Sequence, residues 1–208
     1  MKNVLILGDS IRIGYDKSIR KSLEGIARVE FPEDNCRFAS YFLRHFHEYM
    51  RAFEGEKIDV IHFNTGLWDC LRLFGEEPHT PLDVYAYYIE RICVRIKKLA
   101  PRAKVIFATS TAVLSEKMSD DFKRYNEEIE EYNRTALEIV EKHGFAVNDL
   151  YPISKNLPES SHSDSVHYYT KEGTEAFAKP TLECISQALG IKTPECQIIV
   201  HGEEAFGI

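Results

Sequence analysis

The stretch Val4-Leu5-Ile6-Leu7-Gly8-Asp9-Ser10 decides how this chain is interpreted. Its four consecutive apolar residues predict a short strand that is buried on both faces, as strands of parallel sheets are. A turn that carries a serine follows at once, so we expect the hydroxyl of Ser10 at the carboxyl end of the strand. Ligands of open α/β sheets bind at that end, which makes Ser10 a candidate nucleophile.

A second motif lies near the other end of the chain, where Asp164-Ser165-Val166-His167 places a carboxylate three residues before an imidazole. A serine hydroxyl is a poor nucleophile unless an imidazole base takes its proton, and a carboxylate holds that imidazole in one tautomer. The offset lets Asp164 reach Nδ1 of His167 and leaves Nε2 for Ser10. Each motif alone also fits a plain turn or a capping arrangement. The prediction therefore depends on the fold bringing the two motifs together.

With these two motifs, the sequence resembles the SGNH hydrolases, also called GDSL esterases and lipases, over most of its length. The resemblance implies a flavodoxin-like three-layer α/β/α sandwich with a central parallel sheet, and residues 1–208 as a single domain. It also implies three roles, with Ser10 as the nucleophile, His167 as the base and Asp164 as the residue that orients the base.

Two other residues compete for these roles. His162 is an alternative base, and Asp149 at an expected strand end is an alternative acid. We prefer His167 over His162 because its carboxylate is better placed. Asp149 ranks second as the acid because it lies eighteen residues before His167.

The chain departs from the family pattern at the oxyanion-binding positions. It has Cys36 where the second family block supplies a glycine amide, and Gly66-Leu67-Trp68-Asp69 where the third block usually reads Gly-x-Asn-Asp. An oxyanion donor contributes about 3 to 4 kcal/mol, so an active enzyme should keep one. We expect three groups to bind the oxyanion, namely the amides of Ser10 and Cys36 and the side chain of Asn64. Asn64 lies at the expected carboxyl end of the strand 58–63. The alternative is that Asn64 caps the loop.

Asp9, Arg37 and Trp68 are the expected substrate contacts. The Arg37 and Ala39 pattern is similar to the Gly-Arg-Ser-Ala run of the family's carbohydrate acetylesterases. Trp68, the only tryptophan, either stacks on a sugar ring or lies in the core. The resemblance implies an esterase that hydrolyses a small O-acetyl ester on a carbohydrate. The alternatives are a lysophospholipase or thioesterase with a wider apolar groove, and a binding protein that has lost its oxyanion hole.

Composition limits the remaining function classes. With 208 residues, 44% hydrophobic and 28% charged, the chain has the usage of a soluble globular domain. Its net charge of −7 argues against nucleic-acid or anionic membrane partners. A strand begins directly after Met1-Lys2-Asn3 and no apolar run reaches membrane-spanning length, so we expect a cytoplasmic protein whose partner is a small ester.

Cofactors and metals are not expected. The five cysteines are scattered without a Cys-x-x-Cys pair, and no two histidines are spaced as His-x-x-x-His, so the thiols are expected to be reduced and no metal site is predicted. A flavodoxin-like nucleotide-binding or redox protein is a more distant alternative, because the first loop lacks a glycine-rich phosphate cradle.

Strands and helices alternate along the chain, which predicts a doubly wound parallel sheet. The expected strands are 4–7, 58–63, 104–109 and 145–148, and the expected helices are 38–53, 84–99, 120–143 and 170–189. Residues 68–81 are expected to form a loop, and Gly144 to end the third helix. Residues 192–208 are expected to be a C-terminal arm, in which 197–201 is either an added edge strand or a partner-binding segment.

Overall fold

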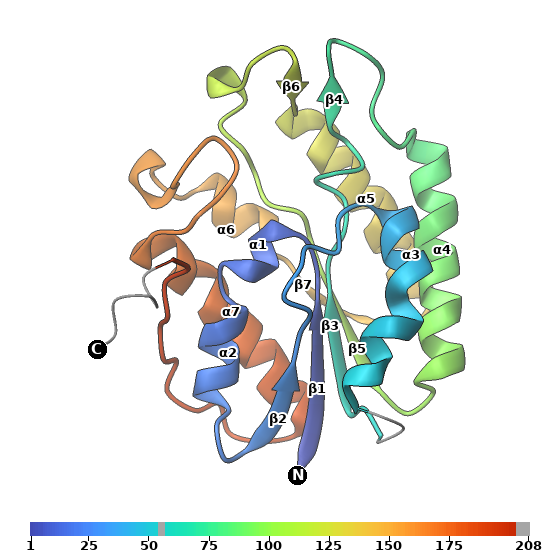
Figure 1. Ribbon diagram of the computed structural model, residues 1–208, viewed down its shortest axis with the longest axis vertical. Helices are drawn as coiled ribbons and strands as arrows, with labels where there is room; N and C mark the ends of the chain where they lie inside the picture. Colours follow the sequence, from blue (N-terminus) through green and yellow to red (C-terminus); the bar gives the residue numbers. More distant parts are fainter. Residues whose placement is uncertain (54–56, 203–208) are drawn as a thin grey trace.

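A five-stranded parallel sheet forms the centre of the molecule, in the strand order β2-β1-β3-β5-β7 (Figure 1). The computed structural model describes residues 1–53 and 57–202. The strands are β1 (Lys2–Leu7), β2 (Ala27–Glu30), β3 (Val60–Phe63), β5 (Lys104–Ala108) and β7 (Ala146–Asn148). All of β3 is buried, and all of β1 except Lys2 and Asn3 belongs to the apolar core, as expected of strands covered on both faces.

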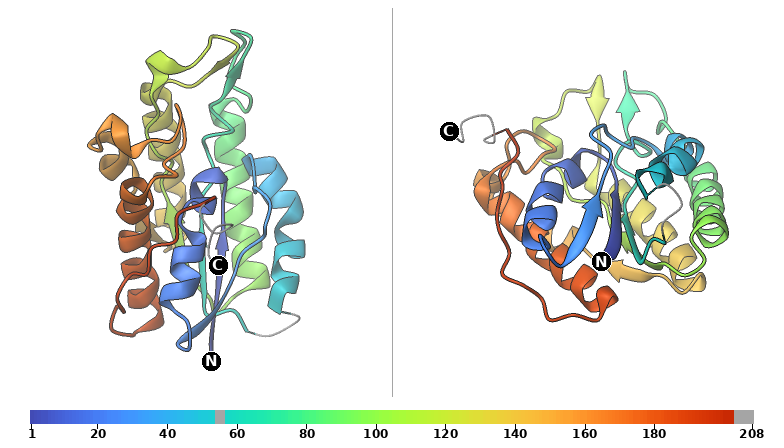
Figure 2. Two further views of the ribbon diagram at one scale, coloured as in Figure 1. Left: turned by 60° about the vertical axis from the view of Figure 1, so that its left-hand side comes forward. Right: turned by 60° about the horizontal axis from the view of Figure 1, so that its bottom comes forward.

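Helices cover both faces of the sheet, which confirms the predicted three-layer α/β/α architecture (Figures 1 and 2). Three neighbouring helices lie on one face, namely α3 (Ala39–Tyr49), α4 (Leu82–Leu99) and α5 (Asn126–Lys142). On the other face, α2 (Asp16–Ser22) packs against α7 (Lys171–Leu189). The remaining helical segments are α1 (Ser10–Ile13), α6 (Tyr151–Lys155) and the 3-10 turns η1 (Met50–Phe53), η2 (Ser115–Lys117) and η3 (Glu159–Ser161).

A two-stranded ribbon stands beyond the carboxyl ends of the sheet strands (Figure 1). It pairs β4 (Arg72–Leu73) with β6 (Phe122–Lys123) in antiparallel register. β4 lies in the expected loop 68–81. β6 consists of residues that were expected to belong to the helix 120–143. That helix, α5, therefore begins at Asn126 rather than at residue 120. The carboxamide of Asn126 exchanges two hydrogen bonds with the backbone of Val113, which fixes this start.

Helix ends follow the expected capping chemistry. Gly144 follows α5 with a φ of 74°, a left-handed conformation that glycine adopts without strain, so the predicted end of this helix is confirmed. At the start of α7, the hydroxyl of Thr170 accepts a hydrogen bond from the amide of Gly173. This cap fixes the beginning of α7 four residues after His167.

The segment that follows α7 forms no strand from residue 191 to residue 202, so it does not extend the sheet. It runs instead along α2, where the hydroxyl of Ser22 accepts a hydrogen bond from the amide of Gln197 at 2.8 Å. The hydroxyl of Ser18 likewise accepts from the amide of Ile199 at 2.9 Å. The part of the expected arm from residue 203 to residue 208 lies outside the described residues.

Within the described part of the chain, no helix is long and apolar enough to cross a membrane. The five cysteines are free thiols, and Cys36, Cys70 and Cys93 are buried. No set of three His, Cys, Asp or Glu side chains in residues 1–53 and 57–202 is placed to hold a metal ion.

Candidate active site

The structure brings together Ser10, His167 and Asp164. Ser10 begins α1 directly after β1, and Nε2 of His167 lies 2.7 Å from its Oγ. Nδ1 of the same imidazole lies 2.7 Å from Oδ2 of Asp164. The three side chains thus form one continuous chain of hydrogen bonds, although 157 positions separate Ser10 from His167 in the sequence. This is the arrangement in which an imidazole can remove a proton from a serine hydroxyl.

The loop around Asp164 explains the three-residue offset. Oδ1 of Asp164 accepts hydrogen bonds from the backbone amides of Val166 and His167, each at 2.7 Å, which leaves Oδ2 for the imidazole. Burial opposes ionisation of Asp164, but the hydrogen bonds from Val166 and His167 outweigh it and lower the pKa of this carboxyl. The carboxylate is therefore ionised at neutral pH and favours the His167 tautomer that carries its proton on Nδ1.

Asp9 lies in the turn between β1 and α1, directly before Ser10. It is fully buried, and its Oδ1 accepts the amide of Ile11 at 3.0 Å as the cap of α1. Burial raises the pKa of Asp9, and interactions with Asn64 and the Ile11 amide partly offset this effect. Asp9 therefore supports the turn that carries Ser10 and is closed off from solvent, and its contact with substrate stays a prediction.

The Cys36 amide was expected to bind the oxyanion, and the structure gives it another partner. Its amide donates to the carbonyl of Gly8 at 2.9 Å, and its side chain is buried. The left-handed residue in this loop is the next one, Arg37, with a φ of 53°. The carboxamide oxygen of Asn35 accepts the Arg37 amide at 2.7 Å and holds that conformation. The Cys36 amide is thus already engaged and is not free to bind an oxyanion.

Asn64 lies beside the turn that carries Ser10, at the carboxyl end of β3. A Cβ atom at Gly8 would come 1.9 Å from Oδ1 of Asn64, so only glycine at position 8 permits this approach. The Asn64 side chain is almost fully buried, and its Oδ1 has no hydrogen-bond partner within the described residues. A loop-capping asparagine would use that oxygen to accept a backbone amide, so the capping alternative does not fit.

Asp69 connects the loop that follows β3 to the start of α3. Its carboxylate accepts the amide of Ala39 at the start of α3 with both oxygens at 3.1 Å, and the hydroxyl of Thr65 at 3.2 Å. Burial raises the pKa of Asp69 to about 7 against these hydrogen bonds. The two loops on this side of the site are therefore held as one unit.

Trp68 and Arg37 lie around the carboxyl edge of the sheet. The half-buried Trp68 ring meets Phe122 of β6 edge to face, with centroids 6.5 Å apart. Arg37 is exposed, and its guanidinium lies 5.0 Å from the ring centroid of Tyr41. Both side chains therefore retain exposed surface that a substrate could contact.

The rival residues are engaged elsewhere. The ring of His162 packs on Tyr168 with centroids 3.9 Å apart, and burial lowers the pKa of His162. Asp149 accepts a hydrogen bond from the hydroxyl of Thr109 at 2.9 Å. Neither side chain takes part in the hydrogen-bonded chain that ends at Ser10.

Sequence reasoning missed Tyr169. The phenol of Tyr169 donates to the carbonyl of Ser10 at 2.7 Å, and its ring stacks on His167 with centroids 4.9 Å apart. The only signal in the sequence was the aromatic pair Tyr168-Tyr169 directly after the histidine.

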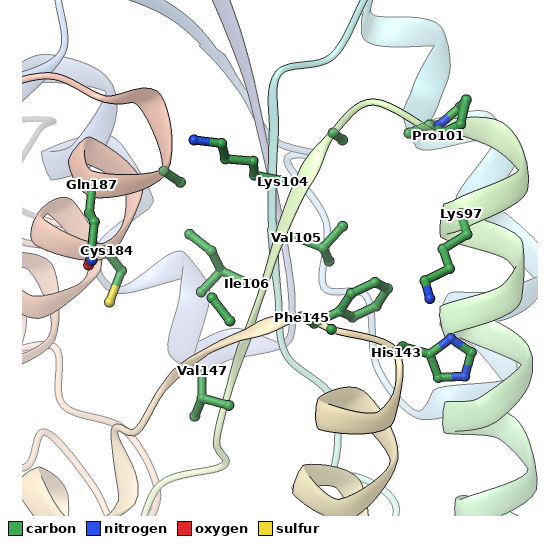
Figure 3. Close-up of a pocket in the computed structure, with 15 residues that line it drawn as sticks. Lys97, Pro101, Lys104, Val105, Ile106, His143, Phe145, Val147, Cys184 and Gln187 are labelled. Carbon is green, nitrogen blue, oxygen red and sulfur yellow. The ribbon is translucent and has the colours of Figure 1, made fainter.

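A cavity of about 600 Å³ lies away from this site, where β5 and β7 begin (Figure 3). Its walls include Lys97, Lys104, His143 and Cys184, and the two lysines lie on different sides of β5 (Figure 3). None of the predicted site residues lines it. The candidate active site is therefore at the opposite end of the strands.

Comparison with solved structures finds the same fold in ester-cleaving enzymes. An acetyl xylan esterase superimposes with a TM-score of 0.70 and 17% identity, over 88% of this chain and 99% of that one. A lipase/acylhydrolase from Enterococcus faecalis gives 0.70 and 17%, over 94% and 100%. An acetylxylan esterase from Geobacillus stearothermophilus gives 0.69 and 16%, over 94% and 97%.

Sequence comparison adds no closer relative, because no family model and no curated protein matches the chain. The resemblance that rests on the motifs around Ser10 and His167 predicted the sheet, its helical layers and the edge at which these residues meet. The chain has the SGNH hydrolase fold.

Proposed function

We propose that this protein is a serine esterase in which Ser10, His167 and Asp164 form the catalytic triad. The observation that carries the proposal is the pair of 2.7 Å contacts that joins Ser10 to His167 and His167 to Asp164. This chain of contacts lies at the carboxyl edge of a parallel sheet, in a fold shared with acetylxylan esterases and acylhydrolases.

The geometry supports a two-step acyl transfer. Ser10 Oγ attacks the ester carbonyl carbon while Nε2 of His167 takes the hydroxyl proton, and the imidazolium then protonates the departing alcohol. Water attacks the acyl-serine with His167 again as the base, which releases the carboxylic acid and restores Ser10. Asp164 stabilises the imidazolium in both steps.

The proposed oxyanion donors are the amide of Ser10 and the side chain of Asn64. Ser10 occupies the first turn of α1, where amides have no acceptor within the helix. Asn64 faces Gly8 of the same turn with its Oδ1, so the proposed donor is its Nδ2 amino group. The Cys36 amide is left out because it donates to the carbonyl of Gly8.

The proposed substrate is a small O-acetyl ester on a carbohydrate. Trp68 supports this choice, because its half-buried ring offers an apolar face on which a sugar ring can stack. Arg37, with its exposed guanidinium, is the proposed polar contact. Two of the structural neighbours are esterases of acetylated xylan, a carbohydrate.

A second candidate is a lipid-type hydrolase, which the similarity to a lipase/acylhydrolase favours. Comparing p-nitrophenyl esters from acetate to palmitate separates the two candidates. We expect kcat/KM to be highest for acetate and to fall as the acyl chain lengthens, whereas a rise toward palmitate would favour the lipid hydrolase.

The direct test is hydrolysis of p-nitrophenyl acetate by the wild type, by Ser10→Ala and by Ser119→Ala, an exposed serine that serves as the matched control. We expect hydrolysis by the wild type and the control, and its loss in Ser10→Ala. Equal rates in all three proteins would overturn the proposal, and inactivity of the wild type toward every ester would favour a binding protein in a hydrolase fold.

A further inference from the structure

Tyr169 connects the two segments that carry the nucleophile and the base. Its phenol donates to the Ser10 carbonyl at 2.7 Å, and its ring stacks on His167 with an interplanar angle of 23°. A Cβ atom at Gly14 would lie 3.0 Å from two carbons of the same ring, so the ring also rests on the residue that ends α1. One side chain therefore contacts both ends of α1 and the imidazole.

The phenol of Tyr169 keeps its proton at neutral pH. Burial raises the pKa of Tyr169, and the nearby Asp9 and Asp164 carboxylates act in the same direction. The phenol is therefore available at neutral pH to donate the hydrogen bond to the Ser10 carbonyl.

The C-terminal segment reaches this tyrosine from the other side of α2. Its Gln197 and Ile199 amides donate hydrogen bonds to Ser22 and Ser18 of α2. Two residues after Ile199, the ring of His201 packs on Tyr169 with centroids 4.5 Å apart. Figure 1 shows the segment running from the end of α7 back toward α1. Contacts therefore link α1 to Tyr169, Tyr169 to His201, and the segment before His201 to α2.

We propose that Tyr169 is a positioning residue that sets the distance between Ser10 and His167, and that His201 of the C-terminal segment holds Tyr169 in place. The inference rests on the proposed triad. Ser10 moves with α1 and His167 with the loop 164–169, and Tyr169 contacts both. Loss of Tyr169 would let the nucleophile and base separate without changing either of them, so turnover would fall while substrate affinity stays the same.

Three variants test the proposal against Tyr87→Phe, a matched control at an exposed tyrosine of α4. Tyr169→Phe removes one hydrogen bond and keeps the ring, so we expect kcat to fall about fivefold with KM unchanged. Tyr169→Leu also removes the stacked ring and should lower kcat by about fiftyfold. His201→Ala should lower kcat by about threefold.

A spectroscopic measurement makes the test independent of hydrolysis. A stacked aromatic ring shifts the NMR signals of the His167 ring protons, so these signals should stay near their wild-type positions in Tyr169→Phe and move in Tyr169→Leu. His201→Ala should broaden or displace them, and Tyr87→Phe should leave them in place.

The outcomes separate this proposal from the proposed function. An inactive wild type whose His167 signals respond as expected would refute the esterase and leave the positioning contact supported. In Tyr169→Leu, a wild-type kcat, a rise in KM with kcat unchanged, or unmoved His167 signals would overturn the role of Tyr169. If Tyr169→Leu fails to fold, a wild-type kcat in Tyr169→Phe or unmoved His167 signals in His201→Ala would overturn the proposal instead.

Discussion

The two halves of the candidate site differ in how they are built. Ser10, His167 and Asp164 are joined by side-chain hydrogen bonds between two short motifs at opposite ends of the chain. The proposed oxyanion half depends on close packing at Gly8, which Asn64 contacts and whose carbonyl accepts a hydrogen bond from the Cys36 amide. The types of three side chains therefore determine the first half of the site. The second half depends on how closely three loops approach one another.

The largest effect is expected on the half that carries the base. His167→Ala should lower kcat by about 10⁴-fold, because Ser10 then has no acceptor for its proton. His162→Ala is the matched control and should leave kcat unchanged, since this ring packs on Tyr168. Steady-state kinetics on p-nitrophenyl acetate measures both variants. A comparable loss in His162→Ala would mean that the base has been assigned to the wrong histidine.

Asn64→Ala probes the oxyanion half and should lower kcat by about 10²- to 10³-fold with little change in KM. Gly8→Ala is its companion, because the added Cβ would displace the Asn64 carboxamide without altering it chemically. Urea unfolding identifies the variants that remain folded. A folded Asn64→Ala protein with wild-type kcat would remove Asn64 from the oxyanion site.

The contrast explains which parts of the site the sequence could predict. The offset between Asp164 and His167 is local, because one carboxylate caps two nearby amides and still reaches the imidazole. The engagement of Cys36 depends on Gly8, 28 residues earlier, and no side-chain pattern encodes a bond between backbone atoms. Tyr169 was missed for a similar reason, since its partner Ser10 lies 159 positions away.

The fold shows the same division between local and long-range signals. The buried strands β1 and β3 are unbroken apolar runs and the long amphipathic helices have a helical period, so both kinds of element were found. β2 was missed because it is a short edge strand in which Arg28 and Glu30 alternate with buried residues. β6 has two residues and exists only through its pairing with β4, so the sequence assigned them to the following helix.

A moderate effect is expected where substrate would meet the site. Trp68→Ala should raise KM for an acetylated xylo-oligosaccharide by about tenfold, because the stacking face is lost. Hydrolysis of p-nitrophenyl acetate, which lacks a sugar ring, should be unchanged. Phe74→Ala, at an exposed residue that follows β4, is the control. An equal rise in KM for both substrates would indicate that Trp68 supports the loop rather than the sugar.

The smallest effect concerns His62 on β3, behind Asn64. This histidine is fully buried, and burial lowers its pKa to about 3. Below pH 6.5 the unfolded chain binds a proton that the folded protein does not, so the stability is complete above that pH and is lost as pH falls toward 3. His62→Gln should reduce the slope of the unfolding free energy between these values by at most about 1.4 kcal/mol per pH unit.

Urea unfolding of the wild type and His62→Gln from pH 4.5 to pH 7.5 measures that slope. The comparison also separates acid loss of the fold from a loss of activity in the folded protein, which would otherwise look alike in an activity profile. Identical slopes for the two proteins would show that His62 does not contribute to acid unfolding.

In the proposed mechanism, Ser10 is the activated nucleophile of a hydrolytic site. Treatment with a fluorophosphonate, followed by mass spectrometry of the intact protein and its peptides, tests this most directly. We predict a single adduct on the peptide that contains Ser10, absent from Ser10→Ala and formed much more slowly in His167→Ala. No adduct on the folded wild type, or an adduct on another residue that persists in Ser10→Ala, would contradict the claim.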